Sequence, residues 1–133
     1  MSIQLDKVQP KNKIQLEQLI GYAFKHNIYD LNFIDTSKIT NMSNLFANCE
    51  YDIDVSNWDV SNVKNMNNMF YCCKNFDCDL SNWNVSNVTD MYSMFTACEN
   101  FKGKGLENWN VSNVTSMRRM FDGCNKLTIP NWY

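Results

Sequence analysis

The sequence predicts an α/β repeat protein in which short strand–helix units stack on one another behind an N-terminal helix. One motif recurs along the 133 residues, each copy pairs an alternating apolar stretch with a helical apolar stripe, and the segment before the copies has helical periodicity. A chain of this length is most often one domain. The expected organisation is an N-terminal segment with a capping helix over residues 1–27, followed over residues 28–133 by about four repeats of 24–26 residues.

The repeat is visible in three stretches, NWDVSNVKNMNNMF (57–70), NWNVSNVTDMYSMF (82–95) and NWNVSNVTSMRRMF (108–121). Methionines at one position of the motif are separated by 24, 25 and 26 residues: Met42, Met66, Met91 and Met117. Phenylalanines follow at the same spacing: Phe46, Phe70, Phe95 and Phe121. A period near 25 is typical of stacked repeats, which bury a core only by packing against neighbouring copies. We therefore expect the fixed apolar residues to form a shared core and the changing residues to face solvent.

Each copy divides into two predicted elements. In FDCDLSNW (76–83), apolar residues alternate with Asp77 and Asp79, which indicates a strand with one buried face. In VSNVTDMYSMF (85–95), apolar residues recur at the spacing of a short helix: Val88, Met91, Met94 and Phe95. Ser86 and Thr89 are candidate N-caps for that helix. The extra residue of a later copy falls beside Gly103 and Gly105, which predicts a bulge or a loosened strand.

The segment before the repeats, residues 10–27, is predicted to be the helix that covers one end of the stack. Its apolar residues lie at roughly helical spacing: Ile14, Leu16, Leu19, Ile20 and Phe24. Asn12 precedes them and is the candidate N-cap.

The motif W-(D/N)-V-S-N-V-x-x-M-x-x-M-F-x-x-C-x-x-F resembles the BspA-like leucine-rich repeat family, and more closely its short Trp/Met-rich branch of bacterial surface repeats of unknown function. The resemblance covers roughly residues 9–133. It implies a leucine-rich-repeat-type solenoid, with a parallel sheet of short strands on one side and short helices on the other. It also implies a role in binding other macromolecules, often at a cell surface, and no catalytic residues.

The composition limits the class of partner and the compartment. A formal net charge of -2 and a pI of about 5.2 argue against a nucleic-acid-binding protein. No apolar run is long enough to predict a membrane span. The start, MSIQLDKVQPKNK, lacks the apolar region of a signal peptide. We therefore expect the cytoplasm or another reducing compartment, with the cell surface as the alternative that the family resemblance suggests.

The six cysteines and the single histidine predict neither a metal centre nor an enzyme. Four cysteines keep one position of the repeat and should form a line of buried free thiols: Cys49, Cys73, Cys98 and Cys124. A zinc site would need ligands that converge on one point. Cys72 lies outside this line and is expected to be the most reactive thiol. Because His26 is alone near the end of the predicted helix, we expect no catalytic group and no cofactor.

Three pairs of residues are candidate partner-binding sites. Arg118 and Arg119, the two arginines of the chain, occupy positions that are uncharged in the other copies. Asp77 and Asp79 belong to a row of carboxylates, which could hold calcium; Lys102 and Lys104 in the next copy favour a solvated face instead. Trp132 and Tyr133 stand where a further copy begins, and would either form an association surface or fold back as a cap.

These observations together predict a non-catalytic module that binds a protein partner on its repeat surface. The alternative is a structural or assembly subunit that self-associates through an uncapped C-terminal end.

Overall fold

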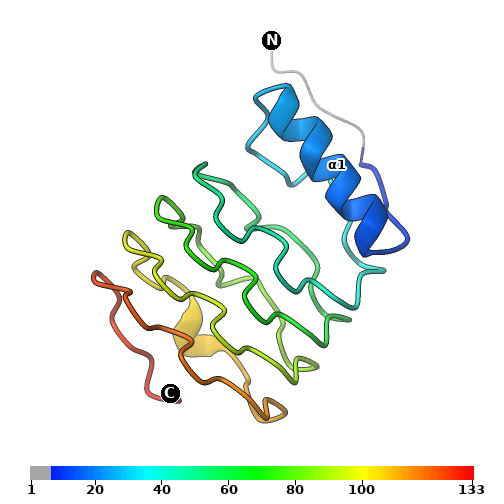
Figure 1. Cartoon of the computed structure of the whole chain (residues 1–133). Helices are drawn as coiled ribbons and strands as arrows, with labels where there is room; N and C mark the ends of the chain where they lie inside the picture. Colours follow the sequence, from blue (N-terminus) through cyan, green and yellow to red (C-terminus); the bar gives the residue numbers. More distant parts are fainter. Residues whose placement is uncertain (1–6) are drawn as a thin grey trace.

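The computed structural model describes residues 7–133 and shows one helix followed by a stack of coils. Helix α1 spans Lys13–Lys25, and the repeats form four coils over residues 29–52, 53–77, 78–103 and 104–126, with a tail over 127–133. Helix α1 lies across one end of the stack and the C-terminus lies at the other (Figure 1). The first six residues of the predicted segment 1–27 lie outside the described part of the chain.

The predicted N-terminal helix and its N-cap are confirmed. Asn12 has an extended backbone, and its side chain accepts the Gln15 N–H at 2.9 Å, which satisfies a donor that the first helical turn leaves without a partner. The face that α1 turns to the first coil carries Leu16, Ile20 and Ala23, all buried. Ile14 was predicted to share this face, but 69% of it is exposed because it lies on the opposite side of the helix.

The predicted leucine-rich-repeat-type solenoid, with a parallel sheet and short helices, is wrong. Within residues 7–133 the backbone forms no strand, and the one helical element besides α1 is the short 3-10 helix η1, Leu106–Asn108. The parallel pairing is limited to isolated bridges: Val8–Ile34, Asp30–Asp54, Asn41–Asn65, Asn65–Asp90 and Asp90–Ser116. Four of these bridges join neighbouring coils, and the fifth joins Val8, which precedes α1, to the first coil; none extends into a ladder.

Consecutive tight turns replace the helix predicted in residues 85–95. Ser93 and Ala97 have φ of 51° and 60°, and a right-handed helix requires negative φ throughout. The backbone closes instead in steps of three residues, with Met94 N–H donating to Met91 O at 3.2 Å and Cys98 N–H to Phe95 O at 3.0 Å. Ser86 and Thr89 therefore cap no helix.

The strand predicted in residues 76–83 has the expected alternation but not the expected pairing. Phe76, Cys78 and Leu80 are buried, while the carboxylates between them face outward. A strand needs a run of neighbouring backbone hydrogen bonds; here Leu80 N–H reaches Lys104 O at 3.0 Å, but Lys102 N–H goes to a side chain instead. The expected bulge at Gly103 and Gly105 is replaced by the left-handed turn that leads into η1.

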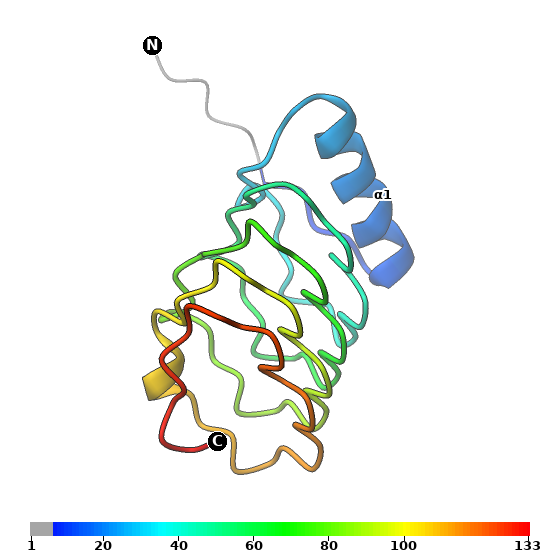
Figure 2. The ribbon, with the colours of Figure 1, turned by 60° about the vertical axis from the view of Figure 1, so that its left-hand side comes forward.

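The prediction that the fixed apolar residues form a shared core is confirmed. The repeated phenylalanines stack nearly parallel along the whole molecule, with ring centroids 5.5–5.8 Å apart: Phe46, Phe70, Phe95 and Phe121. A second column joins Trp83, Trp109 and Trp132 at 6.3 Å. The coils seen in Figure 2 are held in register around these two columns.

Candidate functional site

The most regular surface of the molecule is built from four segments, 42–49, 66–73, 91–98 and 117–124, which we call turn segments; together they form the turn face. Every fourth residue in them has positive φ: Asn44 and Asn48, Asn68 and Cys72, Ser93 and Ala97, Arg119 and Gly123. Glycine and asparagine adopt this conformation at the lowest cost. The sequence places asparagine or glycine at four of these eight positions and other residues at the remaining four.

Neighbouring turn segments are joined by rows of four backbone hydrogen bonds at 2.6–3.0 Å. In each row, alternate residues of the earlier segment donate N–H groups to carbonyls of the later segment and of the residue just before it. Between the second and third segments the pairs are Met66–Asp90, Asn68–Tyr92, Phe70–Met94 and Cys72–Thr96. The same pattern joins the first segment to the second and the third to the fourth. All of these N–H groups therefore point toward the C-terminal end of the stack.

Side chains of the repeat bond in the reverse direction, to carbonyls of the preceding coil. The tryptophan Nε1–H donors pair as Trp58–Leu31, Trp83–Val55, Trp109–Leu80 and Trp132–Leu106. The cysteine thiols pair as Cys73–Phe46, Cys98–Phe70 and Cys124–Phe95. The asparagine amides pair as Asn62–Ser37, Asn87–Ser61 and Asn113–Ser86. The sequence analysis assigned the fixed tryptophans and cysteines to packing alone. The fixed asparagines beside them were the signal that the repeated residues also form hydrogen bonds between coils.

Local turns explain the recurring Asp/Asn-x-Ser in the motif. Asp79 accepts the Ser81 N–H at 3.0 Å and the Ser81 hydroxyl at 2.7 Å. Asn84 and Asn110 likewise accept the N–H two residues on. Such side-chain turns stabilise a bend without a helix or strand. The hydroxyl and N–H of Ser81 also hold the pKa of Asp79 below its ordinary value.

A shallow cavity of about 510 Å³ runs along the turn face. Tyr71, Tyr92, Arg119 and Asp122 line it together with asparagines of the first two segments. Tyr71 is 38% exposed, and the phenol rings and the guanidinium offer both apolar area and hydrogen-bond donors. This arrangement suits contact with a polypeptide surface.

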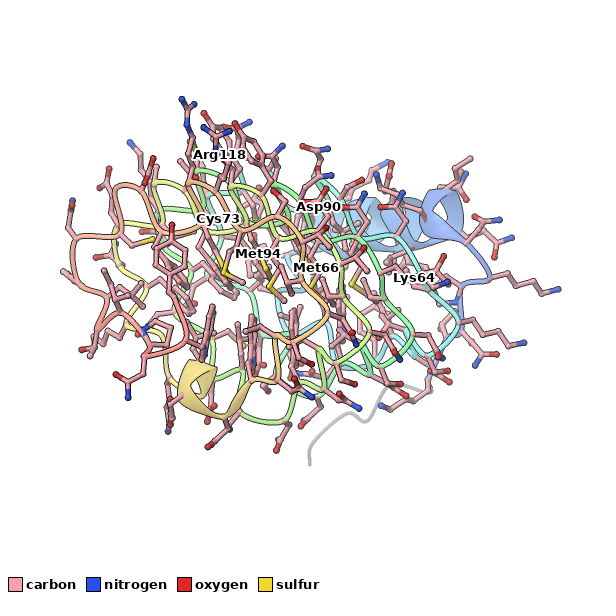
Figure 3. All side chains as sticks on the ribbon, turned by 90° about the horizontal axis from the view of Figure 1, so that it is seen from below. Lys64, Met66, Cys73, Asp90, Met94 and Arg118 are labelled. Atoms are coloured by element: carbon pink, nitrogen blue, oxygen red, sulfur yellow. The ribbon has the colours of Figure 1, made fainter. Side chains whose placement is uncertain are left out.

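Arg118 and Arg119 both lie in the fourth turn segment and are exposed. Figure 3 shows Arg118 projecting from the surface, while Met66, Met94 and Cys73 point into the core. Arg119 lines the cavity. Its backbone is left-handed, with φ of 58°, and the first two segments have asparagine at the equivalent position.

Asp77 and Asp79 lie elsewhere, beside a second cavity of about 280 Å³ that Asp52 and Asp54 also line. Each is paired with a lysine of the next copy: Lys102 Nζ lies 3.8 Å from Asp77 and Lys104 Nζ 3.5 Å from Asp79. No group of three or more histidine, cysteine or acidic side chains in residues 7–133 is arranged to hold a metal ion. The carboxylate row is thus continued by lysines in the next coil.

Trp132 and Tyr133 lie over the fourth coil, which is the position that a C-terminal cap would occupy. The Trp132 ring stacks 6.3 Å from Trp109, and Tyr133 meets Phe121 edge-on at 5.0 Å. Tyr133 nevertheless remains 48% exposed. The three predicted pairs thus occupy three separate regions: the turn face, the acidic face and the C-terminal end.

All six cysteines are free thiols. Burial raises the pKa of Cys73 and of Cys78 to about 12 and that of Cys124 to about 11. Thiols held in the protonated form react slowly. Cys72 is partly exposed, and its predicted higher reactivity stays a prediction.

Fold and surface define a class of protein: stacked coils of turns with a constant interior and a varied outer face. Residues 14–132 match the model of a family described as "Mycoplasma protein of unknown function, DUF285". Because the match spans most of the chain, the chain belongs to this family. No curated protein and no solved structure matches it. The α-helix described here is too short and too polar to cross a membrane, as is every helical element within residues 7–133.

Proposed function

We propose that the protein is a non-catalytic module that binds a protein partner on its turn face. The observation that supports this most is the contrast between constant inward and varied outward positions of the turn segments. The first and fifth positions of every segment are methionine and phenylalanine, whereas the sixth position is Ala47, Tyr71, Thr96 and Asp122 in turn. A rigid scaffold with a varied outer face is what repeat proteins use for recognition.

The partner is expected in a reducing compartment, in agreement with the free thiols. The alternative location at the cell surface follows from the resemblance to surface repeats and stays a prediction. Contact through the cavity would be centred on Tyr71 and Tyr92, because aromatic side chains give large contact area at a low entropy cost.

Site-specific photo-crosslinking tests this function. A photoreactive phenylalanine analogue at position 71 or 92 should capture the same partner, whereas the analogue at position 104, on the acidic face, should not. Arg119→Asn should reduce the yield; asparagine already occupies the equivalent Asn44 and Asn68, so the fold is retained. Equal capture from position 104, or no dependence on Arg119, would count against the turn face.

A second candidate is an assembly subunit that self-associates through its C-terminal end. The observation in its favour is that Ile129 and Tyr133 remain 58% and 48% exposed there. Sedimentation of the intact chain and of a chain truncated after Asn131 tests this candidate. Self-association that is lost on truncation supports it, and a monomer that merely becomes less stable assigns Trp132 and Tyr133 to a cap.

A further inference from the structure

We propose that the fourth turn segment, 117–124, binds an acidic stretch of a polypeptide through a row of backbone N–H groups, with Arg118 and Arg119 pairing with its carboxylates. This inference rests on the proposed protein-binding function, to which it adds the chemistry of the partner. It adds main-chain donors at the edge of the stack, and it shares the Arg119 side chain with the aromatic cavity.

The row consists of the N–H groups of Met117, Arg119, Phe121 and Gly123, which donate to no acceptor within residues 7–133. In each of the three earlier turn segments the equivalent four N–H groups are paired, at 2.6–3.0 Å, with carbonyl oxygens from alternate residues of a neighbouring chain segment. In three places in the molecule, therefore, such a row binds oxygen atoms that are spaced along a polypeptide. The fourth row repeats this spacing and is open at three of its four residues, Met117, Arg119 and Gly123.

The electrostatic field of the peptide dipoles at this edge favours oxygen atoms that carry negative charge. In every row the N–H groups point toward the C-terminal end and the carbonyls toward α1, so the peptide dipoles add as they do along a helix. The fourth segment thus presents the positive pole of the array.

The two arginines add full charges at the same place. The second and third positions of the other segments are Ser43 and Asn44, Asn67 and Asn68, and Tyr92 and Ser93, none of which is charged. Both arginines are exposed, and Asp122 is the one acidic side chain of the segment. Guanidinium groups beside N–H donors form strong, charge-assisted hydrogen bonds with carboxylates.

The accessible donors are those of Arg119 and Gly123, which are exposed, and of Met117, which is partly exposed; Phe121 is covered by the rings of Trp132 and Tyr133. A second copy cannot supply the acceptors by stacking head to tail, because α1 packs on the first coil. Lys13 Nζ donates to the Ser43 hydroxyl there at 3.1 Å, and Phe24 lies 6.5 Å from Phe46. An extended acidic segment from another protein satisfies the same donors without this clash.

Amide NMR of the intact 133-residue chain, titrated with an acetylated polyglutamate peptide, tests the proposal. We expect shifts concentrated at the amides of Met117, Arg119 and Gly123, weaker binding at higher salt, and no comparable effect of polyglutamine. Arg118→Asn with Arg119→Asn gives this segment the residues of Asn67 and Asn68, and should weaken binding about tenfold while the same amides respond. The matched control, Lys102→Asn with Lys104→Asn, removes the same charge from the acidic face and should leave binding unchanged.

Three results would overturn the proposal: shifts centred on Lys102 and Lys104, equal binding of polyglutamine, or tighter binding of oligothymidylate or anionic lipid vesicles at the same amides. The proposed function fails by a different measurement. If positions 71 and 92 crosslink a partner while polyglutamate leaves segment 117–124 unperturbed, the module binds protein but not through its donor row.

Discussion

Replacing Trp83 with phenylalanine tests whether the fixed tryptophans act by hydrogen bonding as well as by packing. The Trp83 ring is 4% exposed, and its Nε1–H donates to Val55 O at 3.0 Å. Phenylalanine removes this donor, while Val55 O keeps the Trp58 N–H at 3.1 Å as its remaining partner, so the loss is that of one hydrogen bond, about 0.5–1.5 kcal/mol. The smaller ring adds about 1–2 kcal/mol for lost packing, so the expected loss is about 1.5–3.5 kcal/mol of unfolding free energy.

Phe95→Leu in the same coil is the matched control, because it removes aromatic volume without touching a side-chain hydrogen bond. Its expected cost is about 1–2 kcal/mol. Urea unfolding followed by circular dichroism, which does not depend on the altered fluorophore, measures both variants. A domain of this size is expected to have about 7–20 kcal/mol of stability, so both variants should remain folded.

Trp132→Phe is a third variant whose loss of unfolding free energy can be compared with the other two. Its indole donates to Leu106 O at 2.8 Å but is only half-buried, so water can replace the lost donor and the cost should fall to about 0.5–1.5 kcal/mol. If Trp83→Phe costs no more than Phe95→Leu or Trp132→Phe, the hydrogen bond does not contribute and the tryptophan column is held by packing alone.

Phe95→Ala should cost about 3–5 kcal/mol, because the buried ring stacks between two others, whereas Arg118→Ala should stay within about 0.5 kcal/mol; similar urea midpoints for the two would contradict the assignment of faces. Gly105→Ala should prevent stable folding, since φ is 94° and a Cβ would lie 2.2 Å from the preceding coil. Gly21→Ala, in the interior of α1 with no atom within 4 Å, should stabilise by about 0.5–1 kcal/mol, and thermal melts of these two variants should move in opposite directions. Stability should fall as the pH rises above about 8.5, because the unfolded chain releases the thiol proton of Cys73 there while the folded chain keeps it up to a pKa of about 12; a Cys73→Ala variant that loses stability as steeply near about pH 10 would assign the effect to other groups.

The sequence was sufficient for α1 and for the core, but not for the path of the backbone. Leu16 and Ile20 follow the period of a helix, and the fixed phenylalanines could only serve a shared interior. The stripe at Val88, Met91 and Met94 has a helical period too, yet a series of tight turns brings residues at that spacing to the same side. The left-handed conformations of Ser93 and Ala97 decide between the two, and rows of hydrogen bonds to the coils on either side hold them in place. These contacts are non-local, so no local pattern indicates them.

The candidate site was predictable to the same limited extent. Arg118 and Arg119 were conspicuous because they depart from the repeat, and the structure places Arg119 beside the cavity of the turn face. Asp77 and Asp79 share one face as expected, but their pairing with lysines of the next coil required the register of the stack. The donor row of segment 117–124 was invisible in the sequence because it consists of backbone atoms, whose direction is set by the coils before it.

The direction in which the side chains bond has a consequence for how the chain is made. All four indoles, three of the four repeat thiols and the amides of Asn62, Asn87 and Asn113 donate to a carbonyl 25–29 residues earlier, as Trp83 does to Val55. A ribosome produces the acceptor before the donor, so each newly emerged coil finds its anchoring points already folded. At about 5–20 residues per second a coil takes a few seconds to synthesise, and turns and short loops close within microseconds. The stack can thus grow from α1 onward at the pace of translation, one coil at a time, without waiting for any later part of the chain to complete those anchors.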